Sequence, residues 1–395
     1  MAHKTLITGG PVIAPTSVIA NGAVLIEDST ILNVGSAASL GKETVDATID
    51  AKGGIIAPGF INLHVHGGGG ADAMDSSFDS LNCMSKFEAS HGVVGFLPTI
   101  MSSPLEQMTG ACKAAAEAID ADRLGSRCTQ GARILGINVE GPFLNSIRKG
   151  AQPEEGIMAP NISVLEKLLD AGGGHIMAMT VAPEIPGAID IIHALASQGI
   201  LVSAGHSDAA YADMERGVAA GIRHVTHTYN GMRGLHHREP GVVGAALTID
   251  DLTCELIIDG VHVHPIAASI VVGMKGAAHV VLVTDSMRAA GLPDGDYTLA
   301  TQHVIVKEGQ ARLESGELAG STLAMDVAVG NMVRLVGVPL PDAIAMASST
   351  PARQLGLDDR KGRLQRGMDA DITILDANTY RATTTISMGK VIFNA

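Results

Sequence analysis

Cysteine is rare in this chain, and its spacing forms no motif. The 395 residues include four cysteines, and no two of them form a C-x-x-C pair. A small fold held together by several disulfides is therefore excluded, and so is a metal or redox site built on paired cysteines. We expect free thiols, as in proteins of the reducing cytoplasm. The cysteines are Cys83, Cys112, Cys128 and Cys254.

Long apolar runs and an excess of basic residues are also missing. No stretch reaches the roughly 18 apolar residues of a membrane-spanning helix, and the N-terminal MAHKTLITGG lacks the apolar run of a signal peptide. Lys and Arg number 27 against 41 Asp and Glu, for a net charge of −14. Nucleic acids require a basic surface. We therefore expect a cytoplasmic protein with neither a nucleic-acid nor a membrane partner, in which an anionic small substrate would need a local cluster of Arg, Lys or His.

The residues that are abundant suit a large folded core. Hydrophobic residues make up 46% of the chain and charged residues 17%, which argues against global disorder. The 47 glycines exceed the usual share of about 7%, as expected for many tight connections between strands and helices. The length suits a large barrel with an accessory domain.

The hydrophobic pattern changes at Pro58. Residues 4–57 alternate short apolar runs with Gly, Asn and Asp, which is typical of β structure. Beyond Pro58, apolar strands alternate with helical patterns, which predicts an α/β fold with a closed (β/α)8 TIM-type barrel rather than an open sheet. The expected strands are 61–66, 93–99, 134–140, 176–182, 200–205, 224–228, 254–260 and 279–285. The expected helices include 79–91, 105–119, 161–171, 187–198, 208–220 and 265–275.

After the eighth expected strand the alternation stops. Residues 296–321 have the pattern of a β-ribbon, and a last helix is expected near 323–336. The tail is β again, and its expected partner is the N-terminal β segment. We therefore predict that residues 1–57 and 356–395 build one small β-sandwich from both chain ends, and that residues 58–355 form the barrel.

The stretch Pro58–Gly70, PGFINLHVHGGGG, joins an expected buried strand to four glycines. Residues i and i+2 of a strand point to the same side, so His64 and His66 form a pair of imidazoles suited to a divalent metal. The glycines leave room for a ligand at the end of the strand. Two core histidines satisfied by hydrogen bonds would have the same spacing, so this motif alone leaves both interpretations open.

Most of the expected strands lead into a carboxylate or an imidazole. In a (β/α)8 barrel the carboxyl ends of the strands meet at one rim, where the active site lies. One such residue could be a helix cap or a structural histidine, but a whole rim of them favours a metal site. The residues are His64, His66, Glu140, His206, His227, Asp259, His262 and Asp285.

Eight segments carry a more specific signal: PGFINLHVHG (58–67), VEGPFLN (139–145), SAGHSDA (203–209), THTYNGM (226–232), REPG (238–241), DGVH (259–262), VTDSM (283–287) and ELAGS (317–321). Spread over nearly the whole chain, they resemble the amidohydrolase superfamily and, within it, the N-acetylglucosamine-6-phosphate deacetylase family. The resemblance implies a metal-dependent amide hydrolase. Its expected reaction converts N-acetyl-D-glucosamine 6-phosphate to D-glucosamine 6-phosphate and acetate, in amino-sugar catabolism.

The resemblance also implies roles for the rim residues. His206, His227 and Glu140 are expected to hold the catalytic metal, and His64 and His66 a second metal that shares Glu140. Asp285 matches the catalytic aspartate and is expected to lie on the metal as well. One or two divalent ions per chain are thus expected, with zinc first and iron, manganese or cobalt as alternatives.

For the substrate, the resemblance implies that Asn230, Gly231, Arg238 and His262 hold the sugar phosphate. In the family this arginine reaches the neighbouring subunit's site, which implies a homodimer. The planar fork of Arg238 suits phosphate. His236 and His237 beside it fit a solvated loop as well as a substrate contact.

Gln152 departs from the one-metal members of the family, which carry a histidine here that polarises the substrate carbonyl. Glutamine can donate a hydrogen bond but cannot become cationic. A second metal at His64 and His66 would supply the polarisation instead. We therefore expect Gln152 in the substrate site, with its role left open.

The expected chemistry follows from the amide bond. Hydrolysis near pH 7 needs an activated water and a proton donor, and Asp285 could take a proton from water and deliver it to the leaving nitrogen. Either Gln152 or His262 could help to stabilise the oxyanion.

Three alternatives compete with this prediction. A deacetylase for the galacto epimer, or for another N-acyl substrate, is not excluded, because few contacts would distinguish the one hydroxyl group at which the epimers differ. Cyclic-amide hydrolases of the dihydroorotase or hydantoinase kind bridge their metals with a modified lysine after the fourth strand, where this chain has TVAPE. A binding protein that had lost its metal should lack some ligands, and none is missing here.

Overall fold

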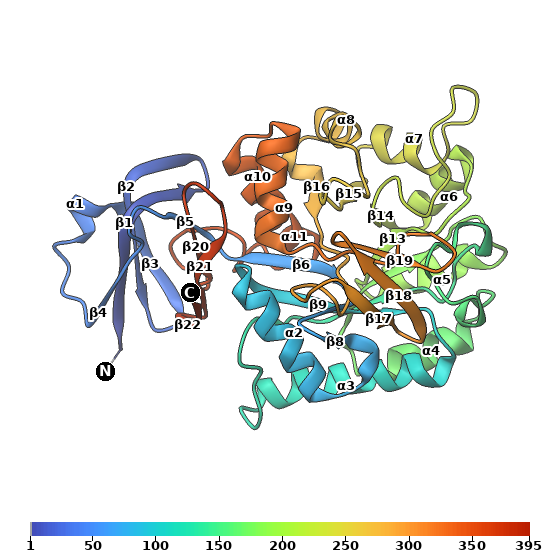
Figure 1. The fold of residues 1–395 in the computed structure, drawn as a ribbon, viewed down its shortest axis with the longest axis horizontal. Coiled ribbons are helices and arrows are strands. Elements are labelled where there is room, and N and C mark those ends of the chain that lie inside the picture. The colour runs from blue at the N-terminus through green and yellow to red at the C-terminus, as the bar shows by residue number, and fades with distance from the viewer. Residues whose placement is uncertain (1) are drawn as a thin grey trace.

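A closed barrel of parallel strands forms the centre of the protein (Figure 1), in the computed structural model that describes residues 2–395. Its nine-stranded sheet contains the two-residue β10 (Arg133–Ile134) and the eight strands expected from the sequence. The predicted (β/α)8 fold is confirmed. The eight strands are β6 (Phe60–Val65), β9 (Val93–Met101), β11 (Ile137–Glu140), β12 (Ile176–Val181), β13 (Leu201–Ala204), β14 (Ile222–Val225), β15 (Thr253–Leu256) and β16 (Val280–Leu282).

The barrel closes between β6 and β16. The backbone N–H of Asp285 donates to the His64 carbonyl at 2.9 Å, and that of His66 donates to the Ser286 carbonyl at 2.9 Å. These bonds form at the carboxyl ends of the two strands. The contact that closes the barrel, which we call the barrel seam, therefore lies at the rim that carries the predicted site residues His64, His66 and Asp285.

Helices separate the strands and cover the outside of the barrel (Figure 1). Side-chain caps fix some of their starts, since Ser77 and Asn161 each accept a hydrogen bond from the backbone of the first turn. The sequence did not predict α7, α10 or α11. Every residue of α7 except Thr248 is buried, so it has no polar face to give a helical period. The helices are α2 (Phe78–Ser90), α3 (Leu105–Arg123), α4 (Ile162–Ala171), α5 (Ala188–Ser197), α6 (Tyr211–Ala220), α7 (Gly241–Thr248), α8 (Pro265–Lys275), α10 (Leu340–Ala347) and α11 (Ser349–Gln354).

Both chain ends contribute to a second, eight-stranded sheet beside the barrel (Figure 1). Its two halves join where β5 pairs antiparallel with β20, with Ile56 opposite Ile374 in a buried apolar cluster. The predicted β domain built from both ends is therefore present, while the boundaries at 57/58 and 355/356 stay predictions. Its strands are β1 (Lys4–Ala14), β2 (Ser17–Glu27), β3 (Thr30–Ser36), β4 (Ala47–Asp50), β5 (Ile55–Pro58), β20 (Ile372–Leu375), β21 (Ala382–Ser387) and β22 (Lys390–Asn394).

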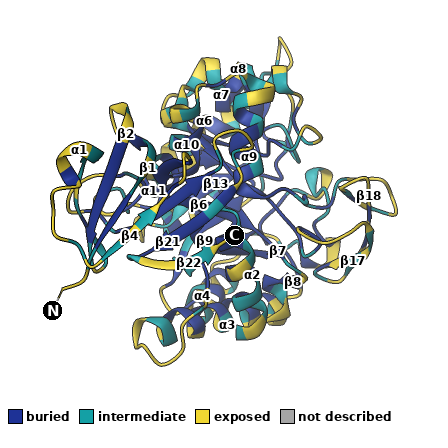
Figure 2. Ribbon diagram, turned by 60° about the vertical axis from the view of Figure 1, so that its left-hand side comes forward, coloured by how far each residue is buried: buried dark blue, intermediate teal, exposed yellow. Residues whose placement is uncertain are grey.

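A three-stranded antiparallel ribbon of β17 (Gly295–Leu299), β18 (Gln302–Lys307) and β19 (Gln310–Leu313) follows the last barrel strand, as predicted. Its outer side is exposed (Figure 2), while its inner apolar residues pack with Met101 at the end of β9. The ribbon therefore lies against the barrel rim. The predicted last helix is α9 (Met325–Asn331), which continues as a π-helix over Met332–Val336. Short elements are α1 (Ala37–Leu40), β7 (Gly67–Gly68) and β8 (Ala71–Asp72).

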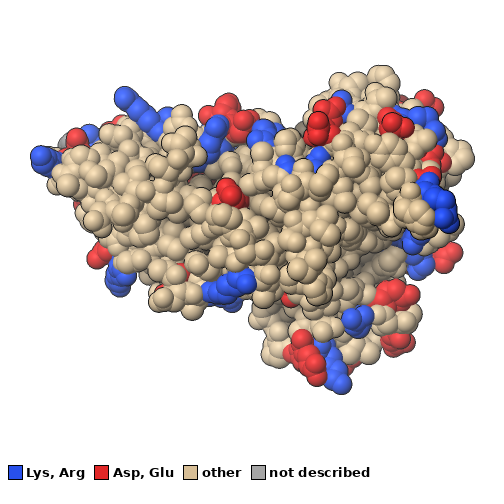
Figure 3. All heavy atoms as spheres, turned by 90° about the horizontal axis from the view of Figure 1, so that it is seen from above, with Lys and Arg blue, Asp and Glu red and all other residues tan. Residues whose placement is uncertain are grey.

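The outer surface carries charges of both signs. On the face drawn in Figure 3, Lys, Arg, Asp and Glu side chains are scattered over a mostly uncharged surface, with no broad patch of one sign there. Within residues 2–395, none of the helices is long and apolar enough to span a bilayer.

Candidate active site

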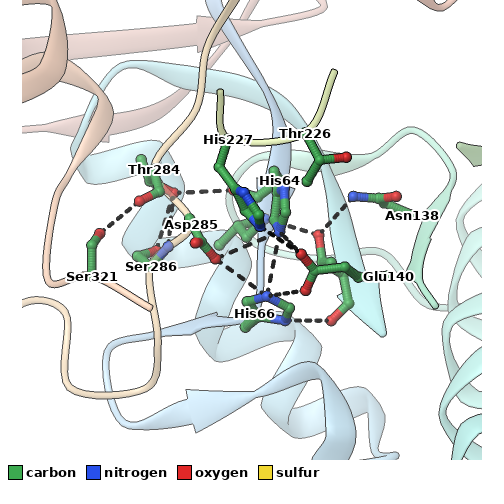
Figure 4. A network of polar contacts seen from close by, with 12 residues as sticks. His64, His66, Asn138, Glu140, Thr226, His227, Thr284, Asp285, Ser286 and Ser321 are labelled. Carbon is green, nitrogen blue, oxygen red and sulfur yellow. Dashed lines mark hydrogen bonds and ion pairs between the residues drawn. The ribbon is translucent and has the colours of Figure 1, made fainter. Parts of the chain in front are cut away.

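Six of the predicted rim residues meet at the mouth of the barrel. Figure 4 shows His64, His66, Glu140, His227 and Asp285 of this set pointing toward one another. All six are buried, and their potential metal-ligating atoms form two groups. Within each group these atoms lie within 4.8 Å of one another. The first group is His64, His66 and Asp285, and the second group is Glu140, His206 and His227.

Strand geometry places the first group. His64 and His66 leave β6 on the same side, with their Nε2 atoms 3.3 Å apart. Asp285 joins them across the barrel seam, and its Oδ1 atom lies 3.2 Å from His66 Nε2 and 3.5 Å from His64 Nε2. The pairing expected from the H-x-H motif is therefore present.

Turns place the second group. His206 and His227 stand just beyond β13 and β14, with φ angles of +46° and +26°, and Asp285 has a φ of +47°. Residues other than glycine rarely adopt this left-handed region. The predicted strand 224–228 is therefore too long at its end, because the chain turns after Val225 and His227 lies in the turn. The turn aims the imidazole back over the barrel mouth, 3.1 Å from the other ring (Nε2 to Nε2).

Glu140 connects the two groups. Its Oε1 atom lies 3.0 Å from the Nε2 atoms of both His206 and His227, and its Oε2 atom lies 3.2 Å from His66 Nε2. Gln152 donates from Nε2 to Glu140 Oε2 at 2.5 Å, and its Oε1 atom accepts from the Ser102 N–H at 2.9 Å. The Gln152 amide is thereby fixed in one orientation, with one N–H engaged on Glu140.

All four imidazoles are anchored through Nδ1. His66, His206 and His227 donate to the backbone carbonyls of Thr99, Arg148 and Asn230 at 3.1, 3.0 and 3.1 Å, and His64 donates to Glu255 Oε2 at 3.1 Å. A neutral imidazole that donates through Nδ1 carries its lone pair on Nε2. When all four rings are neutral, their Nε2 lone pairs therefore converge, with the Nε2 atoms in pairs 3.1 and 3.3 Å apart.

This donor set fits divalent metal ions. Two imidazole lone pairs face each other in each group, and a cation between them would satisfy both. Imidazole and carboxylate are the ligands that zinc and similar divalent ions use in catalytic sites. The buried histidines and carboxylates thus fit one divalent ion per group.

The carboxylates of the site stabilise positive charge on their neighbours. Burial lowers the pKa of His66, but hydrogen bonds with Asp285 and Glu140 outweigh burial and raise it to about 9. Burial raises the pKa of Glu140 and of Asp285, yet the surrounding imidazoles hold the pKa of both carboxyls below its ordinary value. Both carboxylates are therefore ionised near neutral pH.

A cavity of about 260 Å³ opens over both groups. The predicted substrate residues Gln152, Asn230, Gly231 and His262 line it, together with the apolar side chains Met101, Leu299 and Leu318. Its wall holds His262 firmly, because Nδ1 of that ring donates to Asp259 Oδ2 at 2.6 Å. The cavity therefore joins the donor groups to polar side chains that could bind a substrate.

Arg238 does not belong to this cavity within its own chain. It lies on an exposed bend between β14 and α7 that projects from the barrel (Figure 1), with its Nη1 atom 2.8 Å from His237 Nε2. Arg238 therefore lies outside the cavity of its own chain, and its contact with a phosphate in a neighbouring subunit stays a prediction. His236 and His237 share the exposed bend and do not line the cavity either.

Sequence reasoning missed Glu255, which lies on β15 and is 3% exposed. Its carboxylate contacts His64, His224 and the backbone of His227. One signal was available, since Glu255 is a charged residue inside the apolar run CELII. A buried charge in a barrel strand requires partners, and here those partners belong to the site.

Comparison with known proteins places the chain in a family. The amidohydrolase family pattern matches residues 55–392. N-acetylglucosamine-6-phosphate deacetylase of Bacillus subtilis (strain 168) is 38% identical over 394 residues, covering 100% of this chain and 98% of that protein. N-acetylgalactosamine-6-phosphate deacetylase of Escherichia coli O157:H7 is 41% identical over 329 residues, covering 82% of this chain and 85% of that protein.

A solved structure agrees with these relatives. N-acetylglucosamine-6-phosphate deacetylase of Thermotoga maritima superposes with a TM-score of 0.87 at 34% identity, covering 99% of this chain and 100% of that chain. The match extends over the barrel and the sheet from both chain ends. The chain therefore belongs to the amidohydrolase family and, within it, to the group of N-acetylglucosamine-6-phosphate deacetylases, as its motifs predicted.

Proposed function

We propose that the chain hydrolyses the N-acetyl group of N-acetyl-D-glucosamine 6-phosphate to D-glucosamine 6-phosphate and acetate. The observation that carries this proposal is the pair of donor groups sharing Glu140 below one cavity. The names of the relatives support the substrate. The test is to incubate metal-loaded protein with this substrate and measure acetate and free amine. Both should form in equal amounts, and no release would contradict the proposal.

The proposed metal ligands are the two donor groups. Glu140, His206 and His227 would hold the catalytic ion, and His64, His66 and Asp285 a second one, with Glu140 between them. When bound, such an ion polarises the amide carbonyl and lowers the pKa of an adjacent water. Zinc is the proposed ion, and iron, manganese and cobalt suit the same ligands.

Asp285 is the proposed proton carrier. Burial raises the pKa of Asp285, but His64 and His66 outweigh burial and hold it below its ordinary value, so the carboxylate is a base at neutral pH. It lines the cavity, where it can take a proton from the attacking water. The same proton can then pass to the leaving nitrogen, so that the amine departs neutral.

The polar wall of the cavity is the proposed phosphate site. Asn230, Gly231 and His262 lie there, and Asp259 Oδ2 holds the His262 ring in place through Nδ1. Position 231 needs glycine, because its φ is +57° and a Cβ would come within 3.0 Å of His206 Nδ1. His262 could also donate to the oxyanion of the tetrahedral intermediate.

We infer a homodimer in which Arg238 completes the partner's site. Arg238 is exposed outside its own cavity, and the net charge of −14 makes a local cation necessary for a phosphorylated sugar. On α8, Ile266, Ile270 and Met274 are 65%, 48% and 58% exposed at a spacing of four residues. Such an apolar stripe supports a protein contact. The cytoplasm is the proposed location, in keeping with four unpaired cysteines.

A second candidate substrate is N-acetyl-D-galactosamine 6-phosphate. It is favoured by the Escherichia coli relative of that name, which is 41% identical. The two sugars differ at one hydroxyl, so kcat/KM for each, measured with the unphosphorylated sugar as a third substrate, distinguishes them. A higher kcat/KM for the galacto epimer would replace the first proposal.

A further inference from the structure

Glu255 is a buried carboxylate that touches both donor groups without belonging to either. Its Oε2 atom accepts from Nδ1 of His64 at 3.1 Å and from the backbone N–H of His227 at 3.0 Å. Its Oε1 atom accepts from Nε2 of His224 at 3.1 Å. One side chain thus contacts a ligand candidate of the first group and the turn that places a ligand candidate of the second.

The contact with His64 differs from those of the other three rings. His66, His206 and His227 donate Nδ1–H to backbone carbonyls, whereas His64 donates to a carboxylate. A carboxylate acceptor fixes the Nδ1–H tautomer of His64 and makes its Nε2 a better donor to a metal than a backbone carbonyl acceptor does.

The contact with His227 acts on the backbone. That residue has a φ of +26°, which a histidine adopts only where its surroundings hold it. The Glu255 carboxylate satisfies its N–H, and the backbone carbonyl of Glu255 accepts from the N–H of Thr228 at 2.9 Å. Two successive residues of the turn are therefore attached to Glu255.

We propose that Glu255 is a positioning residue that sets the metal affinity of both groups at once. It orients His64 through the side chain and His227 through the backbone. The inference rests on the proposed metal site. It states that Glu255, a residue outside the ligand set, links the metal affinities of the two donor groups.

His224 offers a matched control. It is 1% exposed and contacts Glu255 through Oε1, the oxygen that touches neither donor group. Its Nδ1 atom has no hydrogen-bond partner among the described residues. His224→Gln keeps a donor near Oε1 and should leave metal affinity unchanged.

The test compares metal affinity in wild type, Glu255→Gln, Glu255→Leu and His224→Gln. Each protein is loaded with cobalt or zinc, titrated with chelators of graded strength, and analysed for bound metal, with circular dichroism and thermal melting to check the fold. Glu255→Gln keeps the size and one acceptor oxygen but removes the charge. It should weaken the first group about 10- to 100-fold and the second group less. Glu255→Leu should weaken both.

Unchanged affinity at both groups in folded Glu255→Gln protein would overturn the inference, even if its melting temperature fell, because that result marks a purely structural residue. An equal loss in His224→Gln would overturn it as well. Glu255→Gln is decisive if Glu255→Leu does not fold. Wild-type protein that binds no metal would instead reject the proposed metal site, and this inference with it.

Discussion

The two donor groups share Glu140 but are built in different ways. In the first, regular alternation along β6 places His64 and His66, and Asp285 adds a carboxylate across the barrel seam. In the second, both imidazoles stand in left-handed turns beyond the ends of their strands. Regular strand geometry introduces no backbone strain, whereas each non-glycine residue in the left-handed region destabilises the fold by about 1–3 kcal/mol. The second group, with two such residues against only Asp285 in the first, therefore depends more on the surrounding structure to hold it.

The supports behind the groups also differ. Backbone carbonyls of Arg148 and Asn230 anchor the rings of the second group. In the first group the Thr99 carbonyl anchors His66 in the same way, but side chains add support through Glu255 behind His64 and through Asn62, which donates to Thr284 Oγ1 at 2.8 Å beside Asp285. A substitution removes a side-chain acceptor but not a backbone carbonyl. The first group is therefore the one whose properties single substitutions can tune.

The largest expected effect separates chemistry from metal binding within the first group. Asp285→Asn should lower kcat by several orders of magnitude, since general acid–base groups contribute about 10²–10⁴-fold and this one acts twice. The protein should still bind metal through the remaining ligands. Steady-state kinetics with metal analysis of the same samples measures both. Near-normal turnover in metal-loaded Asp285→Asn would remove Asp285 from the mechanism.

The next effect is on stoichiometry. Wild-type protein reconstituted with excess metal should bind up to two ions per chain, with the first group possessing the weaker position. His64→Asn should retain one ion, because the second group keeps all its ligands, whereas Glu140→Gln should impair both positions. Elemental analysis after gel filtration measures the count. A ceiling of one ion in the wild type would reject the two-metal interpretation and make Gln152 the next candidate for polarising the carbonyl.

The same contrast explains what could be predicted from the sequence. The H-x-H pair follows from the period of a strand, and the predicted strand 61–66 differs from β6 by one residue at each end. His206 and His227 could be placed near strand ends, but the residue type does not signal a left-handed turn, since histidine is enriched in that region yet adopts it only in a minority of cases. Their grouping with Glu140 came from the family resemblance. Glu255 was missed because its partners lie on other strands, which no local pattern reveals.

A smaller effect is expected on binding of the substrate phosphate, whose proposed site is the cavity wall away from the donor groups. Arg238→Ala should raise KM for the phosphorylated sugar about 10- to 150-fold, because a charge-assisted hydrogen bond contributes about 1.5–3 kcal/mol. Turnover of the unphosphorylated sugar should barely change. His237→Ala, which alters the neighbouring exposed ring, is the matched control. Equal losses on both sugars would exclude a phosphate contact.

Mixing subunits distinguishes an arginine that acts in its own chain from one that acts in the partner. Arg238→Ala subunits mixed with Asp285→Asn subunits should regain up to one intact site per heterodimer if Arg238 crosses the interface. Mass spectrometry of differently tagged subunits confirms that heterodimers form. Confirmed heterodimers without recovered activity would exclude the shared site.

The smallest effect tests the side-chain support behind the first group. Glu88 on α2 accepts from Asn62 Nδ2 at 3.0 Å, and the same nitrogen donates to Thr284 beside Asp285. Burial raises the pKa of Glu88 to about 7, although its hydrogen bond with Asn62 opposes the rise. The folded protein therefore binds a proton more tightly than the unfolded chain does. Its stability should be greatest below the unfolded pKa and decline as pH rises from about 4.5 to 7.

Glu88→Gln should remove this pH dependence, since glutamine keeps an oxygen for Asn62 and cannot ionise. Above pH 7 the variant should be more stable than the wild type by an amount on the order of 1–3 kcal/mol. Denaturant unfolding of metal-free proteins at pH 5 and pH 8 measures the difference, and metal-free samples separate it from ligand binding. A variant whose stability changes between these pH values as much as the wild type's would show that Glu88 does not titrate there, and that the polar support behind Asp285 carries no buried charge.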